Sequence, residues 1–185
     1  MTVWLKLMGP NDKGLNPKGC YTKGWTLPSY QGIGEEHTHA GWIGMRLDDL
    51  VVVDCDNDEA KDAWLGHIGQ PLGHTWVRKT PHGWHFLYKR TVASMGVAAA
   101  VPWFIPKLDL KTGVGHLIVW HGQGYSDLHK RPAELWNMDW MPAAGSVPTK
   151  AVEEWGQIPD GFGDNLMIAL AGKLREGGAS QTAIM

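Results

Sequence analysis

The sequence predicts an α+β fold in which a mixed or antiparallel sheet has helices packed on one face. Three observations lead to this prediction. Residues 50–53 are apolar and mostly β-branched, which is typical of a buried strand. Residues 58–68 follow with apolar side chains at helical spacing. Residues 75–80 and 85–90 have strand character around a Pro-His-Gly-Trp turn, which predicts a hairpin.

The remaining expected elements are short and are separated by turn residues. Gly69 and Pro71 should end the first helix. A small N-terminal α/β part should precede the central strand. The other expected elements are strands at 3–7, 40–46, 103–105, 107–111 and 116–120, turns at 47–49 and 112–115, a loop or short helix at 91–100, and an amphipathic helix at 164–175.

Length, charge and cysteine content limit the class of protein. The 185 residues fit one domain with a small appendage, which we place at residues 1–150 and 151–185, the latter a C-terminal helical tail. Cys20 and Cys55 are far apart and outside metal spacing, which favours a reducing compartment. No apolar run approaches the roughly 20 residues of a membrane helix. We therefore expect a soluble, cytoplasmic protein without membrane partners.

The net charge of −2 excludes a protein that binds nucleic acid by overall charge alone. Any such partner would have to be held locally. Most of the 11 tryptophans should be in the core, although exposed ones can stack on bases. Basic side chains cluster in four places: Arg78-Lys79, Lys89-Arg90, Lys107 with Lys111, and Lys130-Arg131.

Two aspartates end the central strand. Because side chains alternate along a strand, Asp54 and Asp56 should point to one face and Cys55 to the other. Their carboxylates would lie roughly 6–7 Å apart and be costly to bury without a partner. Hard oxygen ligands on a rigid base favour Mg²⁺ or Mn²⁺. The alternative is that Asp56, Asn57 or Asp58 caps the following helix.

Two further polar features follow along the chain. His85 begins a strand after Gly83, and Asp109 lies on a later strand. A β-α-hairpin-β pattern can form an RRM-like sheet with a helix behind it, so that Asp54, Asp56 and Asp109 could share a groove. The three aspartates would bind one or two divalent ions. Each residue alone also has a simpler interpretation, His85 as an ordinary strand histidine and Asp109 as an edge charge.

The other candidates would bind a nucleotide. His85 would hydrogen-bond a phosphate or sugar, and Gly83 would let the backbone approach it. Three basic side chains could neutralise a triphosphate, namely Arg78, Lys79 and Lys111.

With these motifs, the sequence resembles the N-terminal domain of bifunctional DNA primase–polymerases in the archaeo-eukaryotic primase superfamily, of phage and plasmid type. Residues 50–56 resemble its first motif, residues 80–88 its threonine-glycine-histidine stretch, and residues 108–119 its third motif. Upstream, the Lys-Pro and Gly-Trp elements of the family resemble residues 17–18 and 24–25, and residues 41–46 resemble its glycine-bearing strand. The resemblance covers roughly residues 15–125.

The resemblance implies a primase-like catalytic domain over residues 1–150. Asp54, Asp56 and Asp109 would be catalytic and metal-binding, and His85 would contact the nucleotide. The implied partners are a DNA template and primer, nucleoside triphosphates and a separate helicase, in the host cytoplasm if a phage encodes the chain. One departure is Trp84, which stands where the family usually has a small residue and would narrow the pocket near His85.

Two other functions remain open. A rolling-circle initiator nuclease would use a metal at His37 and His39 with a tyrosine nucleophile, namely Tyr21, Tyr30 or Tyr125. That scheme leaves Asp54 and Asp56 without a role. A catalytically inactive primase-like module would bind nucleic acid only.

Overall fold

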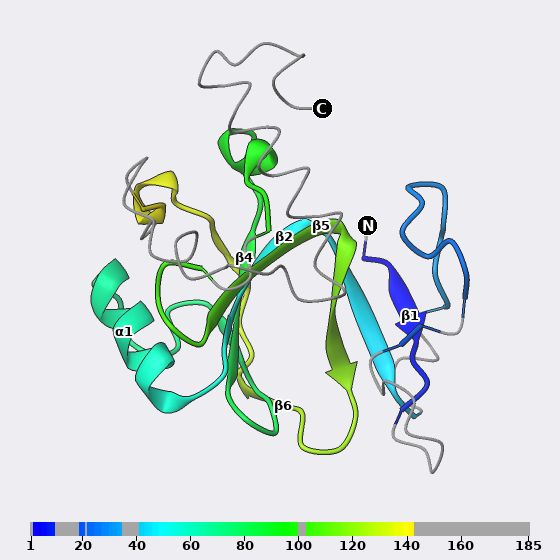
Figure 1. Cartoon of the computed structure of the whole chain (residues 1–185), viewed down its shortest axis with the longest axis horizontal. Coiled ribbons are helices and arrows are strands. Elements are labelled where there is room, and N and C mark those ends of the chain that lie inside the picture. Colours follow the sequence, from blue (N-terminus) through cyan, green and yellow to red (C-terminus); the bar gives the residue numbers. More distant parts are fainter. Residues whose placement is uncertain (1, 10–18, 21, 35–40, 100–102, 143–185) are drawn as a thin grey trace, which may run out of the picture. The chain divides into compact units, whose positions relative to one another are not determined.

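A computed structural model describes residues 2–9, 19–20, 22–34, 41–99 and 103–142 (Figure 1). All of them belong to Met1–Val147, the first of two compact units into which the chain divides. The second unit, Pro148–Met185, lies outside the described residues. The helix expected at 164–175 therefore lies outside them as well.

Within the described residues, one seven-stranded sheet and one α-helix confirm the α+β class. All strand pairs are antiparallel except the short pair between β4 and β7. The elements in chain order are β1 (Trp4–Lys6), β2 (Ile43–Cys55), α1 (Asp58–Ile68), β3 (Trp76–Lys79), β4 (Trp84–Lys89), the 3₁₀ helix η2 (Ala93–Gly96), β5 (Leu108–His121), β6 (Ser126–His129), β7 (Glu134–Leu135) and the 3₁₀ helix η3 (Met138–Trp140).

The central strand is longer than the sequence predicted. β2 continues through residues 47–49, where a turn was expected, and pairs with β5 over residues 43–47 and again over residues 51–55. The register shifts between Leu47 and Val51, so the acidic pair at 48–49 lies in a β-bulge. Asp48 is also neutralised there, because Arg46 Nε donates to its carboxylate at 2.9 Å. The prediction of two separate strands was therefore wrong.

β5 likewise merges two predicted strands into one. The expected turn at 112–115 is part of the strand, and the bulge opposite β2 falls between Thr112 and Gly113. Gly113 has a φ of 84°, which a glycine adopts without strain. The expected strand at 103–105 is absent from the described residues, since residues 104–106 form a bend and turn.

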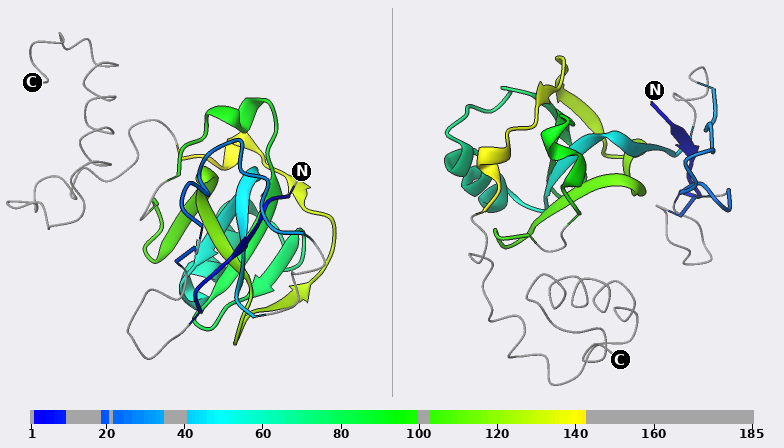
Figure 2. Two further views of the ribbon diagram at one scale, coloured as in Figure 1. Left: turned by 90° about the vertical axis from the view of Figure 1, so that its right-hand side faces the viewer. Right: turned by 90° about the horizontal axis from the view of Figure 1, so that it is seen from above.

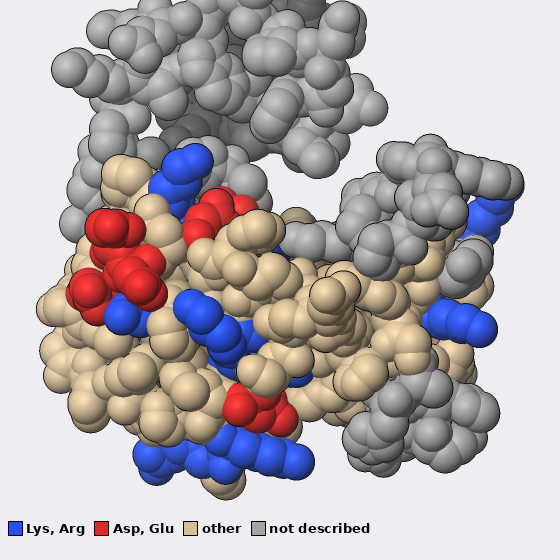
Figure 3. All heavy atoms as spheres, turned by 90° about the horizontal axis from the view of Figure 1, so that it is seen from below, with Lys and Arg blue, Asp and Glu red and all other residues tan. Residues whose placement is uncertain are grey.

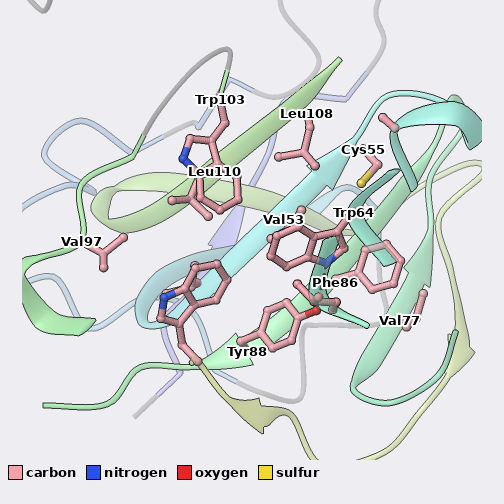
Figure 4. Close-up of a cluster of buried hydrophobic side chains, with 14 residues drawn as sticks. Val53, Cys55, Trp64, Val77, Phe86, Tyr88, Val97, Trp103, Leu108 and Leu110 are labelled. Atoms are coloured by element: carbon pink, nitrogen blue, oxygen red, sulfur yellow. Dashed lines mark hydrogen bonds between the residues drawn. The ribbon is translucent and has the colours of Figure 1, made fainter. Parts of the chain in front are cut away.

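Side-chain alternation gives the sheet two different faces. Val51, Val53 and Cys55 of β2 point toward α1, where they join Trp64 in the main core (Figure 4). Val52 points the other way and packs in a smaller cluster with Leu87 and Ile118 among others. We call this second face the open face. Figures 1 and 2 show α1 and β1 on opposite sides of the central strands.

The helix has the limits that the sequence predicted. Asn57 is the N-cap, and its side chain accepts a hydrogen bond from the Ala60 amide at 2.9 Å. Gly69 ends the helix with a φ of 63°. One of the predicted alternatives, a cap directly after the aspartates, is therefore confirmed at Asn57. No helix formed by the described residues is long and apolar enough to cross a membrane.

Candidate functional site

Five polar residues form a continuous row across the open face, one from each of five neighbouring strands. Asp54 of β2 lies opposite Asp109 of β5 on one side and opposite His85 of β4 on the other. His85 in turn lies opposite Arg78 of β3, which lies opposite Asp127 of β6. Directly opposed residues share a face, so these side chains are neighbours. We call this set the cross-strand row.

Strand alternation explains how the sequence builds the row. Val53 and Cys55 are needed for the core beneath α1, and this fixes Asp54 on the open face. Phe86 fixes His85 in the same way from β4. The structure therefore brings four predicted site residues into the row, namely Asp54, His85, Asp109 and Arg78, and places a fifth, Lys111, against Asp54.

The Asp54 carboxylate contacts two basic side chains, His85 and Lys111. His85 Nε2 lies 3.3 Å from its Oδ1, and Lys111 Nζ bonds to its Oδ2. Asp54 and His85 are only 7% and 5% exposed, so a ligand reaches them only if neighbouring side chains move. Burial raises the pKa of the Asp54 carboxyl, but the hydrogen bond and charge of His85 and the charge of Lys111 outweigh it and hold this pKa below its usual range.

The oxygen donors of the row suit a hard divalent cation in their chemistry, but a lysine stands between them. Lys111 Nζ contacts Asp54 and lies 3.9 Å from Asp109 Oδ2, so one positive charge already stands between the two carboxylates. Mg²⁺ or Mn²⁺ could take that position if Lys111 turned away. Among the described residues, no three His, Cys, Asp or Glu side chains are grouped closely enough to hold a metal as they stand.

Asp56 lies just beyond the end of β2 rather than on it. Its amide donates to the Lys107 carbonyl at 2.9 Å, and the residue is exposed. The two aspartates, which the sequence placed together as metal ligands, therefore differ in burial: Asp54 is buried and Asp56 is exposed. Asp56 stays a predicted ligand that would complete the site from its solvent side.

The residues around the hairpin turn have structural roles that the sequence did not reveal. A Cβ on Gly83 would lie 1.8 Å from the Cys55 carbonyl oxygen, so the close approach that this glycine permits is to β2 itself. Trp84 points away from His85 and donates from Nε1 to Asp58 of α1 at 2.7 Å. It therefore does not narrow the space around His85, contrary to expectation.

The three predicted triphosphate-binding side chains lie in different places. Lys79 is on the α1 side of β3, with its Nζ 3.8 Å from the centre of the Trp84 ring. Lys111 lies between the acids of the row. Arg78 is on the open face next to His85, and it is 4% exposed. The structure therefore does not bring Arg78, Lys79 and Lys111 together.

Arg78 is held in an aromatic and partly unsatisfied environment. Its guanidinium carbon lies 3.8 Å from the Trp120 ring centre, and Nη2 donates to the Trp120 carbonyl. Nε is 3.0 Å from Asp127 Oδ1, but this contact lacks hydrogen-bond geometry. Nε and Nη1 thus have no hydrogen-bond partner among the described residues. Burial lowers the pKa of Arg78, and Asp127 partly offsets the effect.

Trp120 and Asp127 were not predicted as site residues, and Tyr125 was named only as a nucleophile of the alternative nuclease. Tyr125 lies beside His85 with ring centres 6.3 Å apart, and Trp120 and Asp127 flank Arg78. Burial raises the pKa of Tyr125, which opposes a role as the nucleophile of a nuclease. His37 and His39 of that alternative lie outside the described residues. Only the pairing of β6 with β3 would have revealed Asp127.

Comparison of the chain with family models, curated proteins and solved structures finds no match.

Proposed function

We propose that this protein is a template-dependent nucleotidyltransferase, a DNA primase, a DNA polymerase or both, that joins nucleoside triphosphates with Mg²⁺ or Mn²⁺. The cross-strand row is the observation that carries the proposal. It gathers three carboxylates, a buried histidine and a buried arginine on one face of a sheet. The resemblance of the motifs to primase–polymerases agrees with this arrangement, and membership of that superfamily is part of the proposal.

The three predicted aspartates and Lys111 each have one task in this proposal. Asp54 and Asp109 hold the divalent ions from the sheet, and Asp56 does so from the strand end. When bound, the metal would act as a Lewis acid that lowers the pKa of a 3′-hydroxyl and neutralises phosphate charge. Lys111 turns from the carboxylates toward the phosphates. Positioning and charge supply most of the rate in such transfers.

His85 is suited to hold a phosphate or sugar oxygen. Its Nε2 faces Asp54 at 3.3 Å, which fixes the ring, and its Nδ1 is buried without a hydrogen-bond partner among the described residues. Because the Asp54 carboxylate can only accept, Nε2 carries the proton of a neutral ring and Nδ1 is then an unsatisfied acceptor, which a sugar hydroxyl would satisfy; in the doubly protonated ring Nδ1 would donate to a phosphate oxygen. Leaving such a buried group unsatisfied costs about 1–3 kcal/mol, which a bound nucleotide would recover. We expect His85→Ala to weaken nucleotide affinity about 10- to 150-fold. A change confined to the melting temperature would instead make His85 a purely structural residue.

Primer extension with Mg²⁺ and with Mn²⁺ tests the proposal directly. Asp54→Asn should abolish incorporation while the protein stays folded, because it removes a metal-binding charge and little volume. Asp62→Asn is the matched control, since Asp62 is an exposed residue of α1 that pairs with Lys61. An Asp54→Asn variant that extends primers at the wild-type rate would exclude the metal assignment.

A second candidate is a module that binds nucleic acid without catalysis. One observation favours it: Lys111 stands between Asp54 and Asp109, where a catalytic metal would have to bind. For this candidate, neither metal supports extension, whereas single-stranded DNA still binds. Measuring both properties on one preparation separates the two functions.

A further inference from the structure

A large pocket opens on the open face next to the cross-strand row. Its volume is about 940 Å³, which suits a ligand of the size of a nucleotide. Arg78 and Asp127 belong both to the row and to the wall of the pocket. Asp54 and His85 are not among the described residues that line it. The pocket is therefore a separate space beside the proposed catalytic carboxylates.

Aromatic side chains form much of its wall. Trp120 lies between Trp4 and Trp76, with ring centres 5.1 Å away on each side. All three rings line the pocket and are partly exposed, and Tyr125 closes the side toward His85. Indole surfaces of this kind stack on nucleobases with little regard to base identity.

Charge in the pocket is opposite to that of the whole chain. Four lining side chains are basic (Arg78, Lys89, Arg90 and Lys130) and two are acidic (Asp49 and Asp127), an excess of two positive charges. The chain as a whole has a net charge of −2. In Figure 3, basic side chains form a band along the lower edge of the molecule, with one acidic patch directly beside it and a larger acidic group on the left. The pocket thus favours an anion.

Arg78 shows where an anion would bind. Asp127 Oδ1 lies 3.0 Å from Arg78 Nε and accepts a hydrogen bond from Trp76 Nε1 at 2.9 Å, so a carboxylate already occupies an anion position. Nε and Nη1 are nevertheless both buried without a hydrogen-bond partner among the described residues, so a phosphate, with its three oxygens, could satisfy both when Asp127 turns aside.

We propose that this pocket is a second nucleotide-binding site, which takes a nucleoside monophosphate unit with its base on the tryptophans and its phosphate at Arg78. The unit is a free nucleotide or the end of a single strand, because both offer the same base and phosphate. The site goes beyond the proposed catalysis, since it uses neither the metal-binding carboxylates nor His85.

The test is calorimetric titration of the full chain with AMP, adenosine and ribose 5-phosphate, in EDTA so that no metal takes part. AMP should bind at least about tenfold more tightly than either fragment, because only AMP uses both the rings and Arg78. A 5′-phosphorylated tetranucleotide distinguishes the sources: tighter binding than AMP indicates a strand end, and equal binding indicates a free nucleotide. Absence of binding by both, or equal affinity for AMP and adenosine, would overturn the proposal.

Variants locate the bound ligand. Arg78→Gln should lower AMP affinity at least about tenfold if the protein stays folded. Because Arg78 is buried, Lys130→Glu provides a second test at an exposed position and should lower the affinity severalfold. Lys23→Glu is its control, since Lys23 is exposed and does not line the pocket. Equal effects of the Lys130 and Lys23 changes would exclude the pocket. If the protein binds AMP without metal but extends no primers, the proposed catalysis is refuted and the second nucleotide site stands.

Discussion

Among the single residues of the candidate site, Lys111 supplies the positive charge that balances the carboxylates of Asp54 and Asp109. Its ammonium group is shared between Asp54 and Asp109, which would otherwise repel each other across two paired strands. Lysine is suited to such a place because it is a single mobile charge on a flexible chain. The same flexibility would let a divalent cation replace it.

We expect Lys111→Met to have opposite effects without and with metal. Without metal it should lower the free energy of unfolding by about 1–3 kcal/mol, because Asp54 loses a charged partner. With Mn²⁺ the variant should gain more in melting temperature than the wild type, because the ion no longer competes with the ammonium group. Thermal unfolding with and without Mn²⁺ measures both effects.

Lys6→Met, at an exposed position of β1, is the control and should change neither. An equal Mn²⁺ shift in wild type and Lys111→Met would show that the ion does not bind between Asp54 and Asp109.

Part of the site could be predicted from single residues and part could not. Asp54, His85 and Asp109 were predictable because alternation along each strand fixes their face once the apolar neighbours are assigned to the core. Trp120, Tyr125 and Asp127 were not, because their positions depend on how β6 pairs with β3 and how β5 connects to β6. No local pattern in the sequence specifies that pairing.

At the scale of elements, the sequence located β2, α1, β3 and β4 but divided the two longest strands. Acidic residues at 48–49 and glycines at 113 and 115 usually indicate turns, which is why turns were predicted there. In the fold they lie at a shared bulge between β2 and β5. A bulge accepts turn residues without ending a strand. Whether such residues form a turn or a bulge depends on the pairing with the partner strand.

Two glycine substitutions should have opposite effects on stability. Gly83→Ala should lower the free energy of unfolding by at least about 3 kcal/mol, because its Cβ would meet the Cys55 carbonyl and separate β4 from β2. Gly66→Ala lies inside α1 with no atom near its added Cβ and should raise stability by about 0.5–1 kcal/mol. Urea unfolding of both variants measures the difference. A mild effect at Gly83 would mean that the hairpin turn does not press against β2.

For the whole molecule, a chain of hydrogen bonds that runs from the core to the surface ties the helix to the sheet. Trp64 Nε1 donates to Tyr88 Oη at 3.1 Å, and Tyr88 Oη lies 2.8 Å from His74 Nε2. His74 Nδ1 lies 2.9 Å from the Pro71 carbonyl oxygen, which can only accept. The neutral tautomer with its proton on Nδ1 satisfies every group, so Tyr88 donates to Nε2.

Acid should therefore weaken the fold through His74. Burial lowers the pKa of His74, although the Pro71 carbonyl and the charge of Glu134 oppose this and Arg131 adds to it. The folded state then binds fewer protons than the unfolded state, so stability is complete above about pH 6.5 and declines as the pH falls. The loss should be small, because the ring is only half-buried and solvent screens its charge.

Urea unfolding between pH 8 and pH 5 measures this loss. His74→Gln should flatten the pH dependence, whereas His82→Gln, at an exposed position, should not. An unchanged slope in His74→Gln would assign the acid sensitivity to other groups.

The cross-strand row also has a consequence for how the protein is made. Asp54 and Lys111 are 57 residues apart in the chain, and the row is completed by Asp127 on an edge strand that ends at His129. Pairings at such separation form late, because closing a long loop costs entropy before any contact repays it. A nascent chain on the ribosome therefore has no complete row until β6 has emerged. Until β5 has paired with β2, Asp54 lacks its ammonium partner, so the last strands to be synthesised set the moment at which the site first exists.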